Sequence, residues 1–256
     1  MNYHRLEYHL RYLIKRSLGF QRKKVYARVA CLGNQLFNLR YSGAGSPILI
    51  NNQKLRIDLF LDHLKVSSSP VHGFPLKYLK RRDIYPLVIQ QSVINWNMAI
   101  KMDYFMMDSF SELTDQKFTH CKEGWSFCCH YSDLNHDSDF DNYFRSDGLL
   151  PLEDIETTYS SFFNWFSQMF PSTEIYFFHF PTCLDSRIRF KLRSAEIIRV
   201  MKFLEEKMPF IRNIRIDDFD ISAPTTDSFP YHFSEKTLDC FLTEWLKSAS
   251  KNRKTA

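Results

Sequence analysis

Segments typical of β-strands alternate along the chain with longer segments typical of α-helices, and this alternation limits the fold more than any other feature. Runs rich in β-branched and aromatic residues predict strands at about 25–32, 86–91, 103–108, 125–131, 174–180 and 211–217. Apolar residues at three- and four-residue spacing predict helices at about 153–169, 187–207 and 234–248. We therefore expect an α/β fold, a three-layer α/β/α sandwich with a mostly parallel sheet.

Most of the chain is predicted to form one domain. Its 256 residues are enough for a hydrophobic core without a metal or a disulfide. No repeat, proline-rich linker or low-complexity stretch divides the sequence. We expect a single α/β domain over residues 25–248 with an inserted loop at about 120–150, a basic extension at 1–24 and a basic tail at 249–256.

Positive charge is concentrated at the start of the chain. Residues 1–30 have a balance of +7 in a chain whose net charge is +5, which leaves −2 for the remainder. A body without excess positive charge does not suit nucleic-acid binding. Apolar residues at helical spacing in residues 1–24 predict an amphipathic basic helix. It either packs against the body or makes a peripheral contact with an anionic membrane.

The remaining composition excludes several classes of protein. The apolar runs are shorter than the roughly 18 residues of a membrane span, and no secretory signal is present, so we expect a cytoplasmic protein. The six cysteines lack a disulfide-framework spacing and are expected to be reduced. No metal site is predicted, because the group that invites a zinc interpretation lacks paired CxxC spacing: His120, Cys121, Cys128, Cys129 and His130.

Polar residues follow two of the predicted strands, where the ligands of parallel sheets bind. Gly33, Asn34 and Gln35 follow the first strand, and such a turn can direct N–H groups at a developing negative charge or simply reverse the chain. Asp108 and Ser109 end the strand at 103–108 and would present a carboxyl and a hydroxyl group to the same edge.

An aspartate and a histidine lie close together just before the last predicted helix. Asp227 and His232 are five residues apart in a Pro-bearing loop. The carboxylate can hold one imidazole tautomer while the other ring nitrogen acts as a base, and plain turn structure is the alternative. His179, which is flanked by aromatic residues, is interpreted as a core histidine.

The Gly-Asn sequence after the first strand, the polar residues after a middle strand, and the Asp and His before the last helix follow one another in an order that resembles the SGNH, or GDSL-like, hydrolase superfamily. The resemblance covers about residues 25–248. The resemblance implies acyl chemistry with His232 as the base, Asp227 as its orienting partner, and Gly33 and Asn34 in the first block. The chain departs from the family at Gln35, which occupies the position of the nucleophilic serine.

Three interpretations of that departure remain open. Ser109 is the nearest hydroxyl by motif, because DSFS follows a strand. Alternatively, His232 acts as a general base on an acceptor hydroxyl with no covalent intermediate. Finally, catalysis is lost and saccharide binding by aromatic side chains is retained.

We therefore expect an esterase or acyltransferase that acts on a saccharide or glycan precursor, with no bound cofactor but an acyl donor such as acetyl-CoA. A nucleotide-sugar glycosyltransferase is the alternative, because LGNQLF at 32–37 resembles the opening motif of inverting fucosyltransferases. Asp137, Asp139 and Asp141 are spaced to bind a divalent ion. The HxRRGDY-type block that accompanies this motif is absent. A non-catalytic interaction protein is the remaining class.

Overall fold

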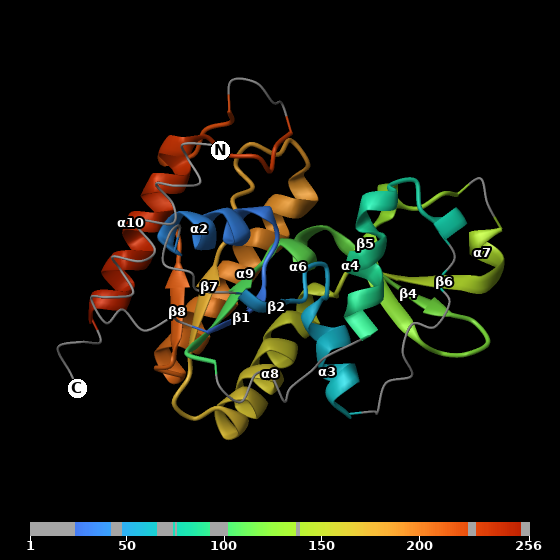
Figure 1. The fold of residues 1–256 in the computed structure, drawn as a ribbon, viewed down its shortest axis with the longest axis horizontal. Coiled ribbons are helices and arrows are strands. Elements are labelled where there is room, and N and C mark those ends of the chain that lie inside the picture. Colours follow the sequence, from blue (N-terminus) through green and yellow to red (C-terminus); the bar gives the residue numbers. More distant parts are fainter. Residues whose placement is uncertain are drawn as a thin grey trace, which may run out of the picture.

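The computed structural model describes residues 24–41, 48–65, 74, 76–92, 102–136, 139–224 and 229–251. They form a mixed α/β fold with a five-stranded sheet and a separate three-stranded sheet (Figure 1). The expectation of an α/β fold with a parallel sheet is thus confirmed. The predicted N-terminal helix and the last residues of the predicted tail, 252–256, lie outside the described residues.

The larger sheet is entirely parallel. Its strands lie in the order β2-β1-β3-β7-β8. Their bounds are β1 (Val25–Arg28), β2 (Ile48–Asn51), β3 (Tyr104–Asp108), β7 (Glu174–Phe178) and β8 (Ile211–Ile214). The chain runs from β1 outward to β2 and then returns to the other side of β1 for β3. The winding therefore reverses between β1 and β3, and this is where sheets of this kind bind ligands.

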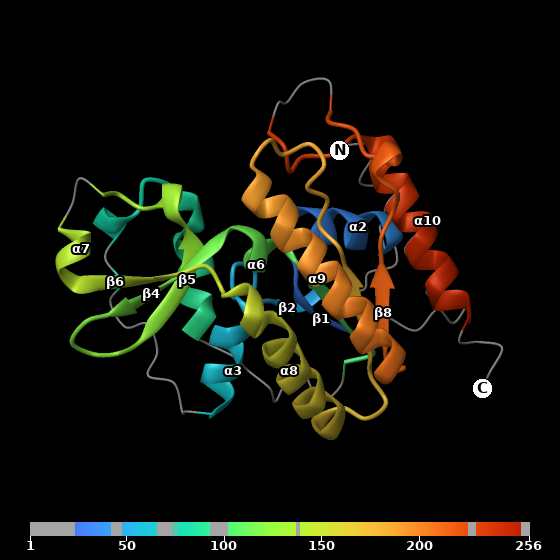
Figure 2. The same cartoon turned by 180° about the vertical axis from the view of Figure 1, so that it is seen from behind.

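Two groups of helices pack with this sheet. Their bounds are α2 (Cys31–Tyr41), α3 (Ile57–Lys65), α8 (Ile155–Met169), α9 (Ile188–Lys207) and α10 (Glu235–Lys251). Helix α2 contacts α10, whereas α8 contacts both α3 and α9. In Figure 1 α2 lies in front of the strands, and in the reversed view of Figure 2 α8 and α9 lie in front. Among the described helices, none is long and apolar enough to cross a bilayer.

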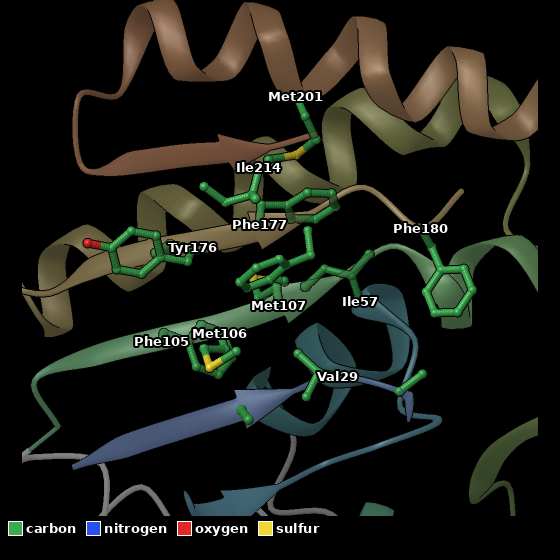
Figure 3. Packing of buried hydrophobic residues seen from close by; sticks show 14 of the residues in the cluster. Val29, Ile57, Phe105, Met106, Met107, Tyr176, Phe177, Phe180, Met201 and Ile214 are labelled. Atoms are coloured by element: carbon green, nitrogen blue, oxygen red, sulfur yellow. The ribbon is translucent and has the colours of Figure 1, made fainter. Parts of the chain in front are cut away.

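The core of the larger sheet is built from consecutive apolar residues. All described positions of β1 and β3 are buried, as expected for parallel strands covered on both faces. Figure 3 shows Met107 and Phe177 of neighbouring strands close to Met201 of α9 and Ile214 of β8. Burial of these side chains from water is the main source of stability for this part of the fold.

The smaller sheet is antiparallel and is inserted between β3 and β7. It contains β4 (Asp115–His120), β5 (Ser126–His130) and β6 (Phe144–Gly148), in the order β5-β4-β6. Lys117 of β4 pairs with Gly148 of β6, so the insertion begins and ends side by side. The predicted inserted loop at 120–150 is thus largely regular structure. Its own core is mostly aromatic: Phe74, Tyr78, Phe118, Phe127, Phe140 and Phe144.

Short helices complete the structure. They are η1 (Leu76–Tyr78), η2 (Arg82–Ile84), α4 (Tyr85–Ile89), η3 (Gln90–Ser92), α6 (Phe110–Thr114), η4 (Tyr131–Asp133), α7 (Phe140–Tyr143), η5 (Leu152–Asp154) and η6 (Asp218–Asp220). The predicted strand at 86–91 is therefore wrong. Pro86 stands in the first turn of α4, where its missing N–H group costs no hydrogen bond.

Buried ion pairs connect the two sheets. Arg28 of β1 donates from Nη1 and Nη2 to the two carboxylate oxygens of Glu112, at 2.7 and 3.0 Å. Lys54 Nζ lies 2.9 Å from Asp133 Oδ2 and 3.6 Å from Asp115 Oδ1. All five side chains are at most 9% exposed, so the junction between the sheets is polar although it excludes water.

Candidate functional site

Asp108, the last residue of β3, organises the carboxyl edge of the parallel sheet. Its Oδ2 accepts a hydrogen bond from Ala30 N at 2.6 Å, and its Oδ1 accepts one from Phe110 N at 3.1 Å. Burial raises the pKa of Asp108 to about 7, although the two N–H groups and Arg28 oppose this shift. The carboxyl group thus ties the exits of β1 and β3 together where the winding reverses.

Ser109 has a structural role at the same edge. Its hydroxyl oxygen accepts a hydrogen bond from Phe180 N at 2.9 Å, and its own N–H donates to Phe178 O at 3.3 Å. The residue is only 2% exposed. This placement joins the exits of β3 and β7 and does not offer the hydroxyl to a substrate.

The first sequence block lies inside α2 rather than in a turn before it. Gly33 is buried, and a Cβ at this position would lie 2.5 Å from Val29 Cβ, so close packing explains the glycine. The backbone N–H of Asn34 donates to Ala30 O at 3.1 Å within the helix. Asn34 and Gln35 are exposed. An oxyanion site built on the N–H group of Asn34 has no support in this geometry.

The loop that carries His232 does reach the exit of β1. Cys31 Sγ, at the start of α2, donates to Tyr231 O at 3.7 Å. The Tyr231 ring lies 5.2 Å from Phe110, which follows β3, and 5.6 Å from Phe180, which follows β7. The exits of three strands therefore meet one loop, through Tyr231.

His232 itself is exposed at this edge, and its ring centroid lies 4.9 Å from that of Phe229. Asp227, its predicted partner, lies outside the described residues. Ser234 begins the last helix as expected from the sequence, because its Oγ accepts from Thr237 N at 3.3 Å. His232, the predicted base, is thus accessible to solvent. It lies two residues before Ser234, where α10 begins.

A buried carboxylate that the sequence analysis missed holds the His232 loop in place. Asp185 accepts hydrogen bonds from the Tyr231 hydroxyl and from Arg187, whose Nη2 lies 2.8 Å from Asp185 Oδ2. Burial opposes ionisation, but the hydrogen bonds from Arg187 and Tyr231 lower the pKa of Asp185 to about 2. The carboxylate is therefore charged at any ordinary pH. An Asp-x-Arg sequence just before a predicted helix is the signal that could have identified it.

His179 is buried, in agreement with its interpretation as a core residue. Its Nε2 lies 3.2 Å from Asn213 Oδ1. Asn213 Nδ2 donates to Met201 O at 2.8 Å, so the amide oxygen must face the histidine, and the proton is assigned to Nε2. Burial lowers the pKa of His179 to about 4, so that the ring is neutral near pH 7.

The acidic loop of the glycosyltransferase alternative is only partly described. Asp139 lies 2.7 Å from Lys77 Nζ, and Asp137 lies outside the described residues. Within the ranges that the structure describes, no group of three or more His, Cys, Asp or Glu side chains is arranged to hold a metal ion.

Two cavities of the described residues lie near this end of the sheet. The larger, about 820 Å³, lies between the segment that follows β8 and helix α10, and it is lined mainly by charged side chains of both signs. It contains none of the predicted site residues. The smaller, about 280 Å³, lies at the carboxyl ends of β7 and β8 and is lined in part by His179.

Comparison with models of known families, with curated proteins and with solved structures finds no match to this chain.

Proposed function

We propose that the protein is an SGNH-like enzyme with three α/β/α layers that hydrolyses an acyl ester of a saccharide or transfers an acyl group to one. The contact between Cys31 Sγ and Tyr231 O is the observation that supports this proposal most, because it brings the exit of β1 beside the loop of His232. The strand order β2-β1-β3-β7-β8 is that of doubly wound sheets, which bind ligands at this edge. The packing of α2 with α10, and of α8 with α9, agrees with helices on both faces.

His232 is the general base in this proposal. It takes the proton from a saccharide hydroxyl, or from water, as that oxygen attacks the carbonyl carbon of the acyl group. The bond to the leaving oxygen or sulfur then breaks, and the leaving group receives the proton from the imidazolium. Base catalysis of this kind contributes roughly 10²- to 10⁴-fold. Phe229, 47% exposed beside His232, offers an aromatic face to the saccharide.

Direct attack without a covalent intermediate fits the side chains at this edge. Gln35 has no nucleophilic group, and the hydroxyl of Ser109 is buried against Phe180 N. Burial and the nearby Asp108 carboxyl raise the pKa of Cys31 to about 11, so its sulfur is a neutral thiol rather than a nucleophilic thiolate. Attack by an acceptor hydroxyl that His232 activates therefore explains acyl transfer without a nucleophilic side chain of the protein.

The test compares His232→Ala with His136→Ala, a matched control outside this edge whose ring stacks on Tyr131 at 4.0 Å. Hydrolysis of p-nitrophenyl acetate and acetyl transfer from acetyl-CoA to saccharides are both assayed, with folding checked by circular dichroism. We expect kcat/KM to fall by about 10²-fold or more in the first variant only. Unchanged turnover in His232→Ala, or saccharide binding without turnover in the wild type, would contradict the proposal.

A further inference from the structure

The smaller cavity, about 280 Å³, has a lining that suits a ligand. It lies between the first half of α9 and the segments that follow β7 and β8. Its polar lining residues are His179, Thr182, Cys183, Lys191, Ser194, Arg215 and Asp218. Apolar side chains, among them Ile198, Ile216 and Phe241, form the rest of the wall. Its volume is close to the lower limit of small-molecule sites, about 300 Å³.

Two hydroxyl groups of largely buried residues line this cavity without a protein partner. Thr182 and Ser194 are 8% and 7% exposed. Neither hydroxyl has a hydrogen-bond partner among the described residues, although most other serines and threonines of the sheet edge and α10 do. Both oxygens are open to the cavity, so a molecule bound there can accept a hydrogen bond from each hydroxyl group.

The charge of the cavity is positive. Lys191 and Arg215 line it, and neither forms an ion pair with a carboxylate of the described chain. Asp218 is the only carboxylate among the lining residues. His179 is neutral near pH 7 because burial lowers its pKa. The lining thus has two cations and one anion, a surplus of one positive charge that favours an anionic ligand, and Arg215 also borders the larger cavity together with Asp217 and Asp220.

We propose that this cavity binds the phosphoryl group of a small phosphorylated ligand. A phosphoryl group presents several oxygen acceptors, which match the hydroxyl donors of Thr182 and Ser194. Lys191 and Arg215 add charge-assisted hydrogen bonds to the same oxygens. The apolar wall and the small volume limit the rest of the ligand to about the size of a monosaccharide. This inference rests on the cavity alone and does not depend on the proposed acyl chemistry.

The test measures binding by calorimetry, with inorganic phosphate and glucose 6-phosphate as probes and glucose as the uncharged control. We expect both phosphates to bind and glucose not to bind. Lys191→Gln and Arg215→Gln should each raise Kd about tenfold or more, and Ser194→Ala should raise it by a smaller factor. Tighter binding of glucose 6-phosphate than of phosphate would identify a phosphorylated metabolite as the ligand rather than the free ion.

Lys202→Gln is the matched control, because this exposed lysine lies on the same helix roughly 16 Å from Lys191. Its Kd values should equal those of the wild type. Absence of phosphate binding at millimolar concentration, or an equal loss in Lys202→Gln, would overturn the proposal. This experiment measures binding and not turnover. A negative result therefore does not bear on the proposed enzyme activity, and unchanged turnover in His232→Ala does not bear on the phosphate site.

Discussion

The two sheets of the molecule bury their strands in different ways. Every residue of β3 is buried, whereas in β4 only Asp115 and Phe118 are buried and the others are partly exposed. The strands β1 and β3 of the parallel sheet are covered on both faces, whereas β4 leaves most of its positions partly exposed. The first four residues of β5 are also buried, where this strand adjoins the main body. The edge that carries His232 therefore belongs to the sheet with enclosed central strands, while β4 and β6 of the smaller sheet are more open to solvent.

Buried ion pairs, rather than a shared hydrophobic core, lie between the two sheets. The two hydrophobic clusters are separate, and Arg28 with Glu112 lies buried at the exits of β1 and β3. Glu112 also accepts a hydrogen bond from Ile57 N at 2.8 Å, which ties α3 to the same point. We therefore expect the two sheets to unfold together.

Removal of the junction carboxylate should have the largest effect. Glu112→Ala leaves the Arg28 guanidinium buried without its partner, and we expect a loss of about 3–5 kcal/mol in the free energy of unfolding. Urea unfolding measures this change. Glu196→Ala, which removes an exposed partner of Arg199, is the control and should cost less than about 1 kcal/mol. Equal effects of the two variants would show that the junction is not a stabilising link.

Alanine substitutions at consecutive positions would sharpen the contrast between the sheets. Met106 and Met107 are both fully buried, so each change to alanine should cost about 2–5 kcal/mol. In β4, Phe118→Ala should cost a similar amount, but Gln116→Ala, at a partly exposed position, should cost less than about 1 kcal/mol. Losses of stability that alternate along β3, or that are equal along β4, would contradict the burial of these strands described above.

The pH dependence of stability should report on Asp108. Its pKa is raised from 3.8 to about 7 in the folded protein, so the folded state binds the proton more tightly than the unfolded chain. The protonated Asp108 carboxyl therefore contributes its full stabilisation to the folded state below pH 3.8, and this stabilisation is lost as the pH rises to about 7. The stability of the wild type relative to Asp108→Asn should thus fall by up to about 1.4 kcal/mol per pH unit across this range. Urea unfolding of both proteins at several pH values measures how this stability difference changes with pH. A difference that does not change with pH would refute the raised pKa of Asp108.

The smallest effect is expected at the surface of the smaller sheet. Lys77 and Asp139 form an ion pair whose side chains are 57% and 39% exposed. Solvent and salt screen such a pair, so Lys77→Ala should leave the free energy of unfolding nearly unchanged. Thermal unfolding at low and high salt measures it. A larger loss would mean that this surface pair fixes the aromatic core beneath it.

The strands of the parallel sheet were predicted better than those of the smaller sheet: β1, β3, β7 and β8 were expected and β2 was missed, whereas only β5 was expected in the smaller sheet. The segments at 103–108 and 174–180 are continuous apolar runs, and they became β3 and β7. The segment of β4, Asp115–His120, has a single large apolar residue, Phe118, so its pattern resembles a loop. In α9 the predicted apolar stripe was partly wrong, because Ile188 and Leu192 are 73% and 60% exposed.

The candidate site was predictable only in part. The meeting of the His232 loop with the first strand follows from the topology of a parallel sheet. The roles of Gly33 and Ser109 did not follow, because packing against Val29 and a hydrogen bond from Phe180 N depend on tertiary contacts. The smaller cavity was also missed, since its polar groups come from three separate elements that no local motif joins.

The adjacent ends of the insertion allow its strands to be bypassed by a short connection. Lys117 and Gly148 are neighbours in paired strands, about 4.8 Å apart in the direction of the hydrogen bonds. A tight turn at this point would bypass most of the insertion and leave the winding of the parallel sheet intact. Lys54, however, belongs to the main body and loses Asp133 in such a truncation. Lys54 keeps Asp115 as its partner, but a shortened variant has to cover Phe74 and Tyr78, which precede β3 and share their aromatic core with the insertion.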